Sequence, residues 1–523
     1  MSPRDPFIES LLPRRLSTVR TGESSSLDMC LVAGLIETLP ARPTEGTDMN
    51  GKGPALDVVV QGGRVVTSTD VLDTAIGIRG DKIAAIAPPE LLPKAERTID
   101  ATGKIVLPGA IDSHCHLGTG YDDWRGGPIA AAHAGLTTLL GFMLCDHTVK
   151  ETLPQAIKKL RDETEQTSVL DFGFHFILQH TPYILEGIPE AIALGATSFK
   201  LFMTYKKRAP RMCPDDFIIA AMELVAKHGG VTQLHCENGD VIDYLENKAI
   251  AEGRLEPRHF PPTCPDWAEE EAINRAIVMG AMTGSPVYVV HLSSKLGLER
   301  IKQAQAQGQR VWTETCPQYL LLDDSLMDKW GPFAKMGPPL RPKNGPDRDA
   351  LWAGSAQGYI ATVGSDHAAR TKEEKEPGWK NVFVYPDGRS IPFGAPSIET
   401  MVPLMYSEGV VKRGLPLTWM ARVLAENTAR IFGCYPKKGV IRVGADADLL
   451  LIDPEPSWTM RAADLHGIAG MTLYEGWPMR GRPWMTLLRG RVVLNQGKLE
   501  QEPGYGRYVR RGAPAPPIAG AVV

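Results

Sequence analysis

The segment Ile-Asp-Ser-His-Cys-His-Leu-Gly at 111–118 places two histidines two residues apart at the end of a short apolar run. Successive side chains of an extended strand point to opposite faces, so His114 and His116 would point one way and Cys115 the other. Two neutral imidazoles on one face can bind a single metal ion. Taken alone, the pair could also be partly buried polar residues at a strand end, so the rest of the chain must decide.

Four further residues are candidates for the same site. His235, His291 and Asp366 each end an apolar run, and Lys200 lies inside another run, "TSFKLFM". Desolvating an ammonium is costly, so a buried lysine needs a partner, a lowered pKa or a chemical change. Carbamylation by carbon dioxide is one such change, and it would make the amine a carboxylate able to bridge two metal ions. Each residue alone could be structural, as a helix cap is for Asp366, but their joint occurrence at strand ends predicts a metal site.

The residues that flank these candidates have less certain roles in the sequence. Cys115 and Cys236 each follow a proposed ligand and should point away from the site, and Cys316 ends a neighbouring run. Small buried thiols behave mainly as apolar residues, which is the role we expect for all three. His367 either orients the site or is structural.

Eight apolar runs of strand length alternate with helix-like stretches through the middle of the chain. The stretches at 213–230 and 266–284, for example, show helical apolar spacing with acidic starts and glycine stops. The alternation predicts a parallel (β/α)₈ barrel, in which the active site lies at the carboxyl ends of the strands. The candidate ligands occupy those ends. The eight runs are Ile105–Asp112, Leu136–Leu144, Leu170–Leu178, Thr197–Met203, Val231–His235, Pro286–His291, Arg310–Cys316 and Tyr359–Asp366.

Short apolar segments typical of β-strands, separated by Gly-Gly and Gly-Asp turns, occur on both sides of this region. They cover 55–106, as in "DVVVQGGRVV", and return within 433–500, as in "WMTLLRGRVVLNQGK". We therefore expect one small β-sandwich built from both ends of the chain, around a barrel at 107–432.

The two termini show no sustained periodicity. Residues 1–54 are rich in Arg, Ser, Thr, Pro and Gly and are expected to form a disordered extension. Met49 is a candidate for the true start, which leaves open whether residues 1–48 occur in the native protein. The Pro/Gly-rich tail at 501–523 is expected either at a subunit interface or as plain disorder.

The composition is that of a soluble globular protein with small-molecule partners. Apolar residues make up 43% and the net charge is −4 without a long basic run, so nothing suggests nucleic acid or an anionic membrane surface as partner. No apolar run approaches the ~20 residues of a membrane span. The eight cysteines form no CxxC pair, which indicates reduced thiols and a cytoplasmic location.

Over roughly residues 55–500 the sequence resembles the dihydropyrimidinase/D-hydantoinase family of cyclic amidases, in the amidohydrolase superfamily. The resemblance implies a hydrolase that acts on C–N bonds in cyclic amides, with hydantoin and dihydropyrimidine rings as default substrates. It also implies a homotetramer. Besides "IDSHCH", it rests on "FKLFMTYKK" (199–207), "LHCENGD" (234–240), "VYVVHLSS" (287–294), "ETCPQYLLLDD" (314–324), "KMGPPLR" (335–341), "GSDH" (364–367) and "NTARIFGCYPKKGVIRVGADADLLLID" (427–453).

The same resemblance assigns roles to the candidate residues. It implies two divalent metal ions, with zinc as the usual occupant. A hydroxide that bridges them would attack the ring carbonyl, and Asp366 would pass its proton to the leaving nitrogen. Tyr205 would support the oxyanion, although a plain aromatic at the rim is the alternative. The implied ligands are His114, His116, carbamylated Lys200 and Asp366 for one ion, and Lys200, His235 and His291 for the other.

Three departures from the family concern the substrate pocket. Gly337 replaces a serine that binds substrate mainly through its backbone, and glycine could keep this contact while loosening the loop. Phe393 stands where the family has an asparagine that contacts the cyclic imide. The loop "LGTGYDDWRGG" after the paired histidines is shorter than in the family. Together these departures predict a pocket for a larger or more apolar ring than dihydrouracil.

Other functions remain open at the level of sequence. An allantoinase or dihydroorotase-like activity would use the same scaffold, and the latter needs an arginine for the substrate carboxylate. Arg125 is one candidate, with surface solvation as the other explanation. A non-catalytic scaffold homologue is disfavoured because all six ligand positions are filled. The physiological ring, the preferred enantiomer and the native metal are left undetermined.

Overall fold

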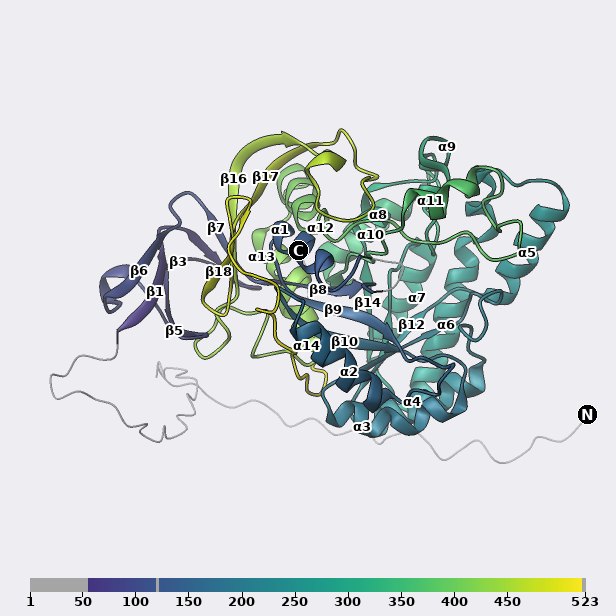
Figure 1. Ribbon diagram of the computed structural model, residues 1–523, viewed down its shortest axis with the longest axis horizontal. Helices are drawn as coiled ribbons and strands as arrows, with labels where there is room; N and C mark the ends of the chain where they lie inside the picture. Colours follow the sequence, from purple (N-terminus) through teal and green to yellow (C-terminus); the bar gives the residue numbers. More distant parts are fainter. Residues whose placement is uncertain (1–54, 119–121, 520–523) are drawn as a thin grey trace, which may run out of the picture. The chain divides into compact units, whose positions relative to one another are not determined.

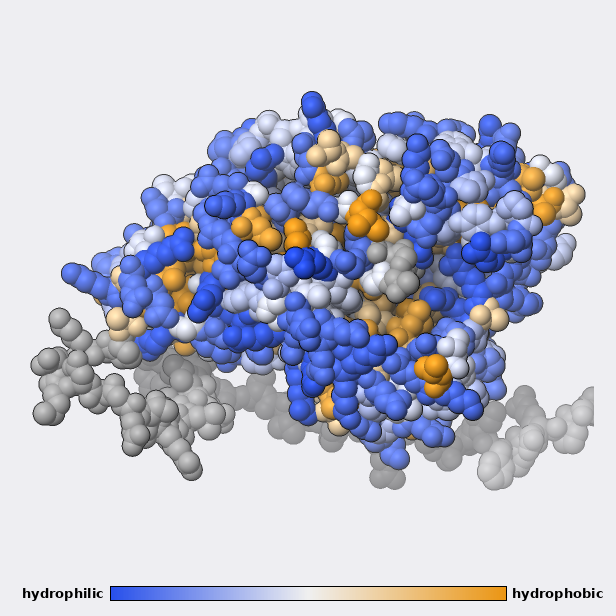
Figure 2. Space-filling view, in the orientation of Figure 1, coloured by the Kyte–Doolittle hydropathy of each residue, from blue (hydrophilic) through white to orange (hydrophobic). Residues whose placement is uncertain are grey.

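The computed structural model describes residues 55–118 and 122–519. The extension predicted at 1–54, including Met49, lies outside the described residues. All the described residues belong to one compact unit, so the exact domain boundaries stay predictions. Within the described part, no helix is both long and apolar enough to cross a bilayer. Figure 2 shows a face that is mostly hydrophilic, with small scattered hydrophobic patches.

Eight parallel strands form a nearly closed barrel, as predicted. Neighbouring strands in the sheet are also neighbours in sequence, and their residues are almost all buried, which is typical of strands covered on both faces. The strands are β8 (Ala110–Cys115), β9 (Leu136–Leu144), β10 (Asp171–Ile177), β11 (Ser198–Phe202), β12 (Val231–His235), β13 (Val287–Val289), β14 (Val311–Thr315) and β15 (Thr362–Val363).

Hydrogen bonds beyond the end of β15 join it to β8 and complete the ring. The backbone N–H of His116 donates to the carbonyl of His367 at 2.8 Å. The Ser365 hydroxyl donates to Asp112 Oδ2 at 2.6 Å and to the carbonyl of His114 at 2.9 Å. The segment around Asp366 is thereby held beside the paired histidines.

Helices cover the outside of the barrel in the order that the sequence predicts (Figure 1). The stretches predicted as helical at 213–230 and 266–284 contain α4 and α6. The α-helices are α1 (Gly126–Ala134), α2 (Leu153–Glu165), α3 (Ile188–Ala193), α4 (Asp215–Lys227), α5 (Gly239–Ala251), α6 (Asp266–Thr283), α7 (Lys295–Ala306), α8 (Pro317–Leu321), α9 (Leu326–Trp330), α10 (Asp347–Gln357), α11 (Lys372–Lys375), α12 (Met401–Leu404), α13 (Leu417–Ala421) and α14 (Asn427–Ile431).

Two further sheets form the predicted β-sandwich from both ends of the chain. Strands from the two ends pair directly in the larger sheet, where β7 is antiparallel to β16. Apolar side chains of both sheets, among them Ile76 and Leu451, share one core. The smaller sheet has the order β5-β4-β1-β6 and the larger β19-β18-β17-β16-β7-β2-β3. The strands are β1 (Leu56–Gln61), β2 (Arg64–Val66), β3 (Val71–Asp73), β4 (Ala75–Arg79), β5 (Lys82–Ala87), β6 (Ala95–Asp100), β7 (Ile105–Pro108), β16 (Leu449–Thr459), β17 (Pro478–Leu488), β18 (Arg491–Asn495) and β19 (Lys498–Leu499).

The run predicted as one strand at Ile105–Asp112 is divided between the two parts. Its first half is β7 of the sandwich and its second half begins β8 of the barrel. Gly109 lies at the junction, where a Cβ atom would come within 2.3 Å of the Thr137 hydroxyl oxygen. Glycine is required at this close approach, which sequence periodicity does not reveal.

The C-terminal tail packs against the barrel of its own chain as far as it is described. Val509 N–H donates to the carbonyl of Phe172 at 2.7 Å, and Phe172 N–H donates to the carbonyl of Arg507 at 3.1 Å. The Arg511 guanidinium donates to the Ser198 hydroxyl at 2.7 Å. The role of this tail at a subunit interface stays a prediction.

Candidate metal centre

All six predicted ligands line one cavity of about 490 Å³ at the carboxyl ends of the barrel strands. Their side chains come from five strands or from the residues that directly follow them, although they span 253 positions of sequence. The list is His114 and His116 on and after β8, Lys200 on β11, His235 at the end of β12, His291 after β13 and Asp366 after β15.

Three of these residues lie within contact distance of one another. Asp366 Oδ1 is 3.1 Å from Nε2 of His114 and 3.6 Å from Nε2 of His116. One ligand atom from each of the three lies within 4.8 Å of the other two. Across the cavity, the ring centroids of His235 and His291 are 4.4 Å apart. The nitrogen and oxygen atoms therefore converge as a metal centre requires.

The backbone is strained at three positions of the site. Tyr205, His291 and Asp366 adopt φ angles of 70°, 40° and 48°, in the left-handed region that non-glycine residues seldom enter. Each such residue costs on the order of 1–3 kcal/mol and persists only where the surrounding structure fixes it. The strain indicates that these side chains are held in place for a function.

Two features of the buried groups test whether divalent ions would fit here. His291 Nδ1 is buried and has no hydrogen-bond partner among the described residues. His114 Nε2 is also buried and faces the Asp366 carboxylate, another candidate ligand, at 3.1 Å. Lys200 is 1% exposed, and its Nζ lies near the rings of Phe142 and Phe202 without an ion pair to any described residue. Burial lowers the pKa of Lys200 to about 8, which favours the neutral amine that carbamylation requires. An unsatisfied imidazole nitrogen, a second imidazole facing a carboxylate and a buried amine together fit metal binding.

Two buried glutamates fix the histidine rings from behind, and sequence reasoning did not single them out. Glu314 on β14 accepts from His114 Nδ1, from Ser113 and from the Tyr288 hydroxyl. Glu237 Oε2 lies 2.6 Å from Nε2 of His235. Carboxylates that bond the second nitrogen of a histidine set its tautomer and raise its basicity. For Glu314 the sequence did contain a signal, because this acidic residue interrupts the apolar strand "VWTETC".

Replacing Glu314 by glutamine is expected to weaken metal binding by about 10- to 100-fold, the usual effect of removing such a partner. The His114 ring would lose the carboxylate that orients it. Metal affinity is measured by titrating the chelated protein with zinc. The half-exposed Glu299 offers the matched control Glu299→Gln, and equal affinity in both variants would contradict the orienting role of Glu314.

The residues that flank the candidate ligands lie outside the set of ligand atoms. The Nδ1 of His367 accepts backbone N–H bonds from Ser397 and Ile398, and its Nε2 lies 2.9 Å from Asp122 Oδ2. Both of its nitrogens are thus occupied by other groups of the protein, so His367 is not placed as a further metal ligand. Arg125 is exposed at the start of α1 and does not line the cavity, so it is not the carboxylate-binding arginine.

The seven described cysteines, including Cys115, Cys236 and Cys316, are free and buried.

Tyr205, Gly337 and Phe393 form one wall of the cavity. The ring centroids of Tyr205 and Phe393 are 5.1 Å apart. A Cβ atom at position 337 would lie 2.5 Å from the Tyr205 hydroxyl and 3.2 Å from the Phe393 ring. The two departures are therefore coupled, because the absent side chain of Gly337 leaves the space that Tyr205 and Phe393 occupy. Their contact with substrate stays a prediction.

Comparisons with known proteins agree with this geometry. A model described as "Amidohydrolase family" matches residues 105–493. The D-hydantoinase of Geobacillus stearothermophilus is 38% identical over 467 residues, which cover 87% of this chain and 96% of that protein. The L-hydantoinase of Paenarthrobacter aurescens is 33% identical and covers 87% of this chain and 98% of that protein. The crystal structure of dihydropyrimidinase from Brevibacillus agri NCHU1002 has a TM-score of 0.82 at 35% identity, over 88% of this chain and 99% of that chain.

Proposed function

Because this chain belongs to the amidohydrolase family, we propose that it hydrolyses the C–N bond of a cyclic amide and opens the ring to a carboxylate. The prediction of a cyclic-amide hydrolase is confirmed by its relatives. The observation that carries the mechanism is the convergence of four histidines, an aspartate and a buried lysine in one cavity. Hydantoin and dihydropyrimidine rings are the substrates we expect first.

The proposed cofactors are two divalent ions, with zinc as the expected metal. When bound, they would supply a water molecule of lowered pKa next to the ring carbonyl. One ion would be held by His114, His116, Asp366 and carbamylated Lys200, and the other by Lys200, His235 and His291. Support comes from the unpartnered Nδ1 of His291 and from the buried amine of Lys200.

The residues of the chain itself would move the proton and bind the developing charge. Asp366 would take the proton of the attacking water and return it to the ring nitrogen as the C–N bond breaks. Burial raises the pKa of Tyr205 well above its usual value, so its hydroxyl stays protonated and can donate a hydrogen bond to the carbonyl oxygen in the transition state.

The experiment that tests this function combines elemental analysis with a ring-opening assay. Protein reconstituted with zinc and bicarbonate is expected to hold two metal ions per chain and to open hydantoin, dihydrouracil or glutarimide. Chelation should abolish the activity and zinc should restore it. Two metal ions without turnover of any of these rings would contradict the substrate class, and no metal after reconstitution would favour the non-catalytic homologue.

Replacing Phe393 by asparagine is expected to raise kcat/KM for dihydrouracil or hydantoin by roughly tenfold, the value of one well-placed hydrogen bond to a ring amide. The ring of Phe393 has no group that could form a hydrogen bond with a ring amide of the substrate. Steady-state kinetics with both rings measure the change. Phe393→Leu, which stays apolar, is the matched control, and an unchanged or lower value in the asparagine variant would contradict the inferred role.

Allantoinase or dihydroorotase-like activity is the alternative on the same scaffold, and the assay above can be extended to both rings. The homotetramer and the cytoplasmic location remain proposals. They rest on the family resemblance and on the absence of a CxxC pair in the sequence.

A further inference from the structure

Two arginines enter the cavity that holds the candidate ligands. Arg208 and Arg211 both line it, together with the wall residues Tyr205 and Phe393. Among the described residues that line this cavity, Asp366 is the only one with a carboxylate, and its Oδ1 lies at His114 and His116. The cavity therefore brings two guanidinium groups close to the candidate ligands, while its described lining carboxylate lies at the two histidines.

The loop that carries the two arginines is held at several points. Arg208 N–H donates to the carbonyl of Tyr205 and Arg211 N–H to that of Arg208, both at 2.8 Å. Cys213 N–H donates to the carbonyl of Phe202 at the end of β11 at 2.9 Å. These backbone bonds give the loop a defined path from the strand that carries Lys200 and fix where its two arginines begin.

Aromatic rings of the cavity support both guanidinium groups. The Arg208 guanidinium lies 4.7 Å from the Phe393 ring centroid and 5.2 Å from that of Tyr205. Arg211 lies 5.2 Å from the Phe202 ring centroid. The Arg208 guanidinium also donates to the carbonyl of Ile391 at 3.4 Å. A guanidinium stacked on a ring directs its N–H groups along its own plane, and this planar fork matches the two oxygens of a carboxylate.

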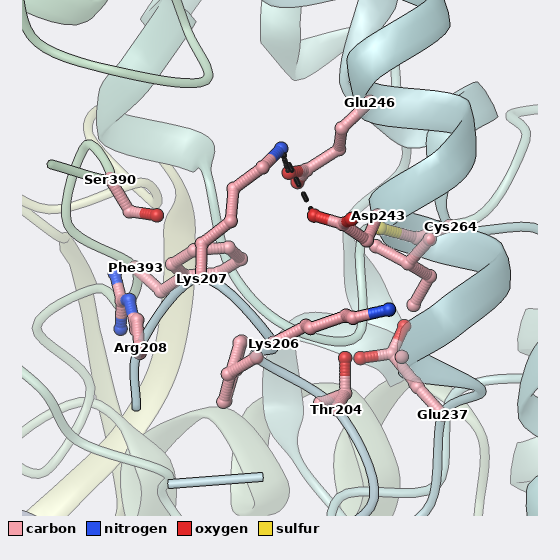
Figure 3. A pocket seen from close by; sticks show the side chains of 13 residues that line it. Thr204, Lys206, Lys207, Arg208, Glu237, Asp243, Glu246, Cys264, Ser390 and Phe393 are labelled. Carbon is pink, nitrogen blue, oxygen red and sulfur yellow. Dashed lines mark hydrogen bonds and ion pairs between the residues drawn. The ribbon is translucent and has the colours of Figure 1, made fainter. Parts of the chain in front are cut away.

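A neighbouring cavity of about 400 Å³ is lined by acidic as well as basic side chains (Figure 3). Arg208 and Phe393 also line this second cavity, but its lysine Lys207 is ion-paired with Asp243 at 3.4 Å and Glu246 at 2.9 Å. Its positive charge is thus already matched by acidic residues. An anionic group would be favoured on the metal-centre side of Arg208 and not in this second cavity.

We propose that Arg208 and Arg211 bind a negatively charged substituent of the substrate, so that the preferred substrates are cyclic amides whose ring carries a carboxylate. This inference rests on the proposed function and narrows its substrate class. It also supplies the carboxylate-binding role for which the exposed Arg125 is unsuitable. Bidentate hydrogen bonds between guanidinium and carboxylate are stronger than those between neutral groups, so they would discriminate between charged and neutral rings.

The test compares two hydantoins of equal size with the zinc-loaded enzyme. One carries a 2-carboxyethyl group at C5 and the other a 2-carbamoylethyl group, so they differ in charge and hardly in shape. The wild-type enzyme is expected to prefer the acid by roughly tenfold or more in kcat/KM, mainly through KM. Arg208→Gln and Arg211→Gln should each reduce this preference, and the double variant should abolish it. Arg208→Lys, which keeps the charge, should retain part of it.

A matched control separates this effect from a general effect of charge. Arg258 is exposed, ion-paired with Glu256 and outside both cavities, so Arg258→Gln should keep the preference for the acid. Equal turnover of acid and amide by the wild type would overturn the inference while leaving the proposed function intact. Preference for the acid that survives in the double variant would overturn it as well.

Failure of the proposed function would give a different result. If neither compound nor unsubstituted hydantoin is opened, calorimetric titration of the same zinc-loaded protein with the acid and the amide decides. Tighter binding of the acid that is lost in the double variant would support the anion site, while the proposed hydrolysis of hydantoin rings would be refuted. Equal or undetectable binding of both would overturn the anion site too.

Discussion

Replacing Lys200 by alanine is expected to leave a folded protein that binds fewer than two metal ions and has lost at least ~10³-fold in ring opening, because the loss of a metal ion removes several kcal/mol of transition-state stabilisation. The side chain is 1% exposed and makes no ion pair with a described residue, so its removal breaks no structural contact of that kind. Elemental analysis after reconstitution and the ring-opening assay measure the two effects.

A second buried lysine of this chain provides the control. Lys335 is also 1% exposed, but its Nζ donates to the carbonyls of Val382 and Ile391. Lys335→Met should lower stability yet keep two metal ions per chain. Carbon-13 NMR after reconstitution with labelled bicarbonate should show a carbamate signal in this control that is absent in Lys200→Ala. Two bound metal ions and full activity in Lys200→Ala would refute the bridging role.

The barrel and the convergence of the candidate ligands in one cavity were predictable because both follow from local patterns. Continuous apolar runs of strand length alternate with helical spacing, and a ligand at the end of a parallel strand must lie at the same edge as the others. His235 and Asp366 are therefore brought together by topology alone. The division of the run at Gly109 was not predictable, since it depends on the contact with Thr137 from a different strand.

Residues that act through a neighbour, or that lie in a loop, were not predicted from strand and helix periodicity. Glu314 is recognised only once its bond to His114 is known. Arg208 and Arg211 lie in a loop without periodicity, and their entry into the cavity depends on how that loop folds back. The sequence suggested that Gly337 loosens its loop. In the structure, a side chain at this position would collide with Tyr205 and Phe393. Such couplings are set by tertiary contacts and leave no periodic signal in the sequence.

Replacing Asp366 by asparagine is expected to lower kcat by about 10²- to 10⁴-fold, the range for removing a general acid–base, while most of the bound metal is retained. Asparagine keeps the size and one oxygen of the side chain but cannot accept the proton. Burial alone would raise the pKa of Asp366, yet the contacts with His114 and His116 hold it well below its usual value, so the wild-type residue starts as the base.

Metal content and kinetics measured on one preparation distinguish proton transfer by Asp366 from metal binding. A low kcat with two metal ions per chain and a KM within a few-fold of wild type would assign the defect to proton transfer. Asp240→Asn, at an exposed aspartate, is the control for the substitution itself. A near-normal rate in Asp366→Asn would remove Asp366 as the proton carrier, and another group of the cavity would then have to protonate the leaving nitrogen. Loss of metal together with rate would make Asp366 chiefly a ligand, consistent with its position 3.1 Å from Nε2 of His114.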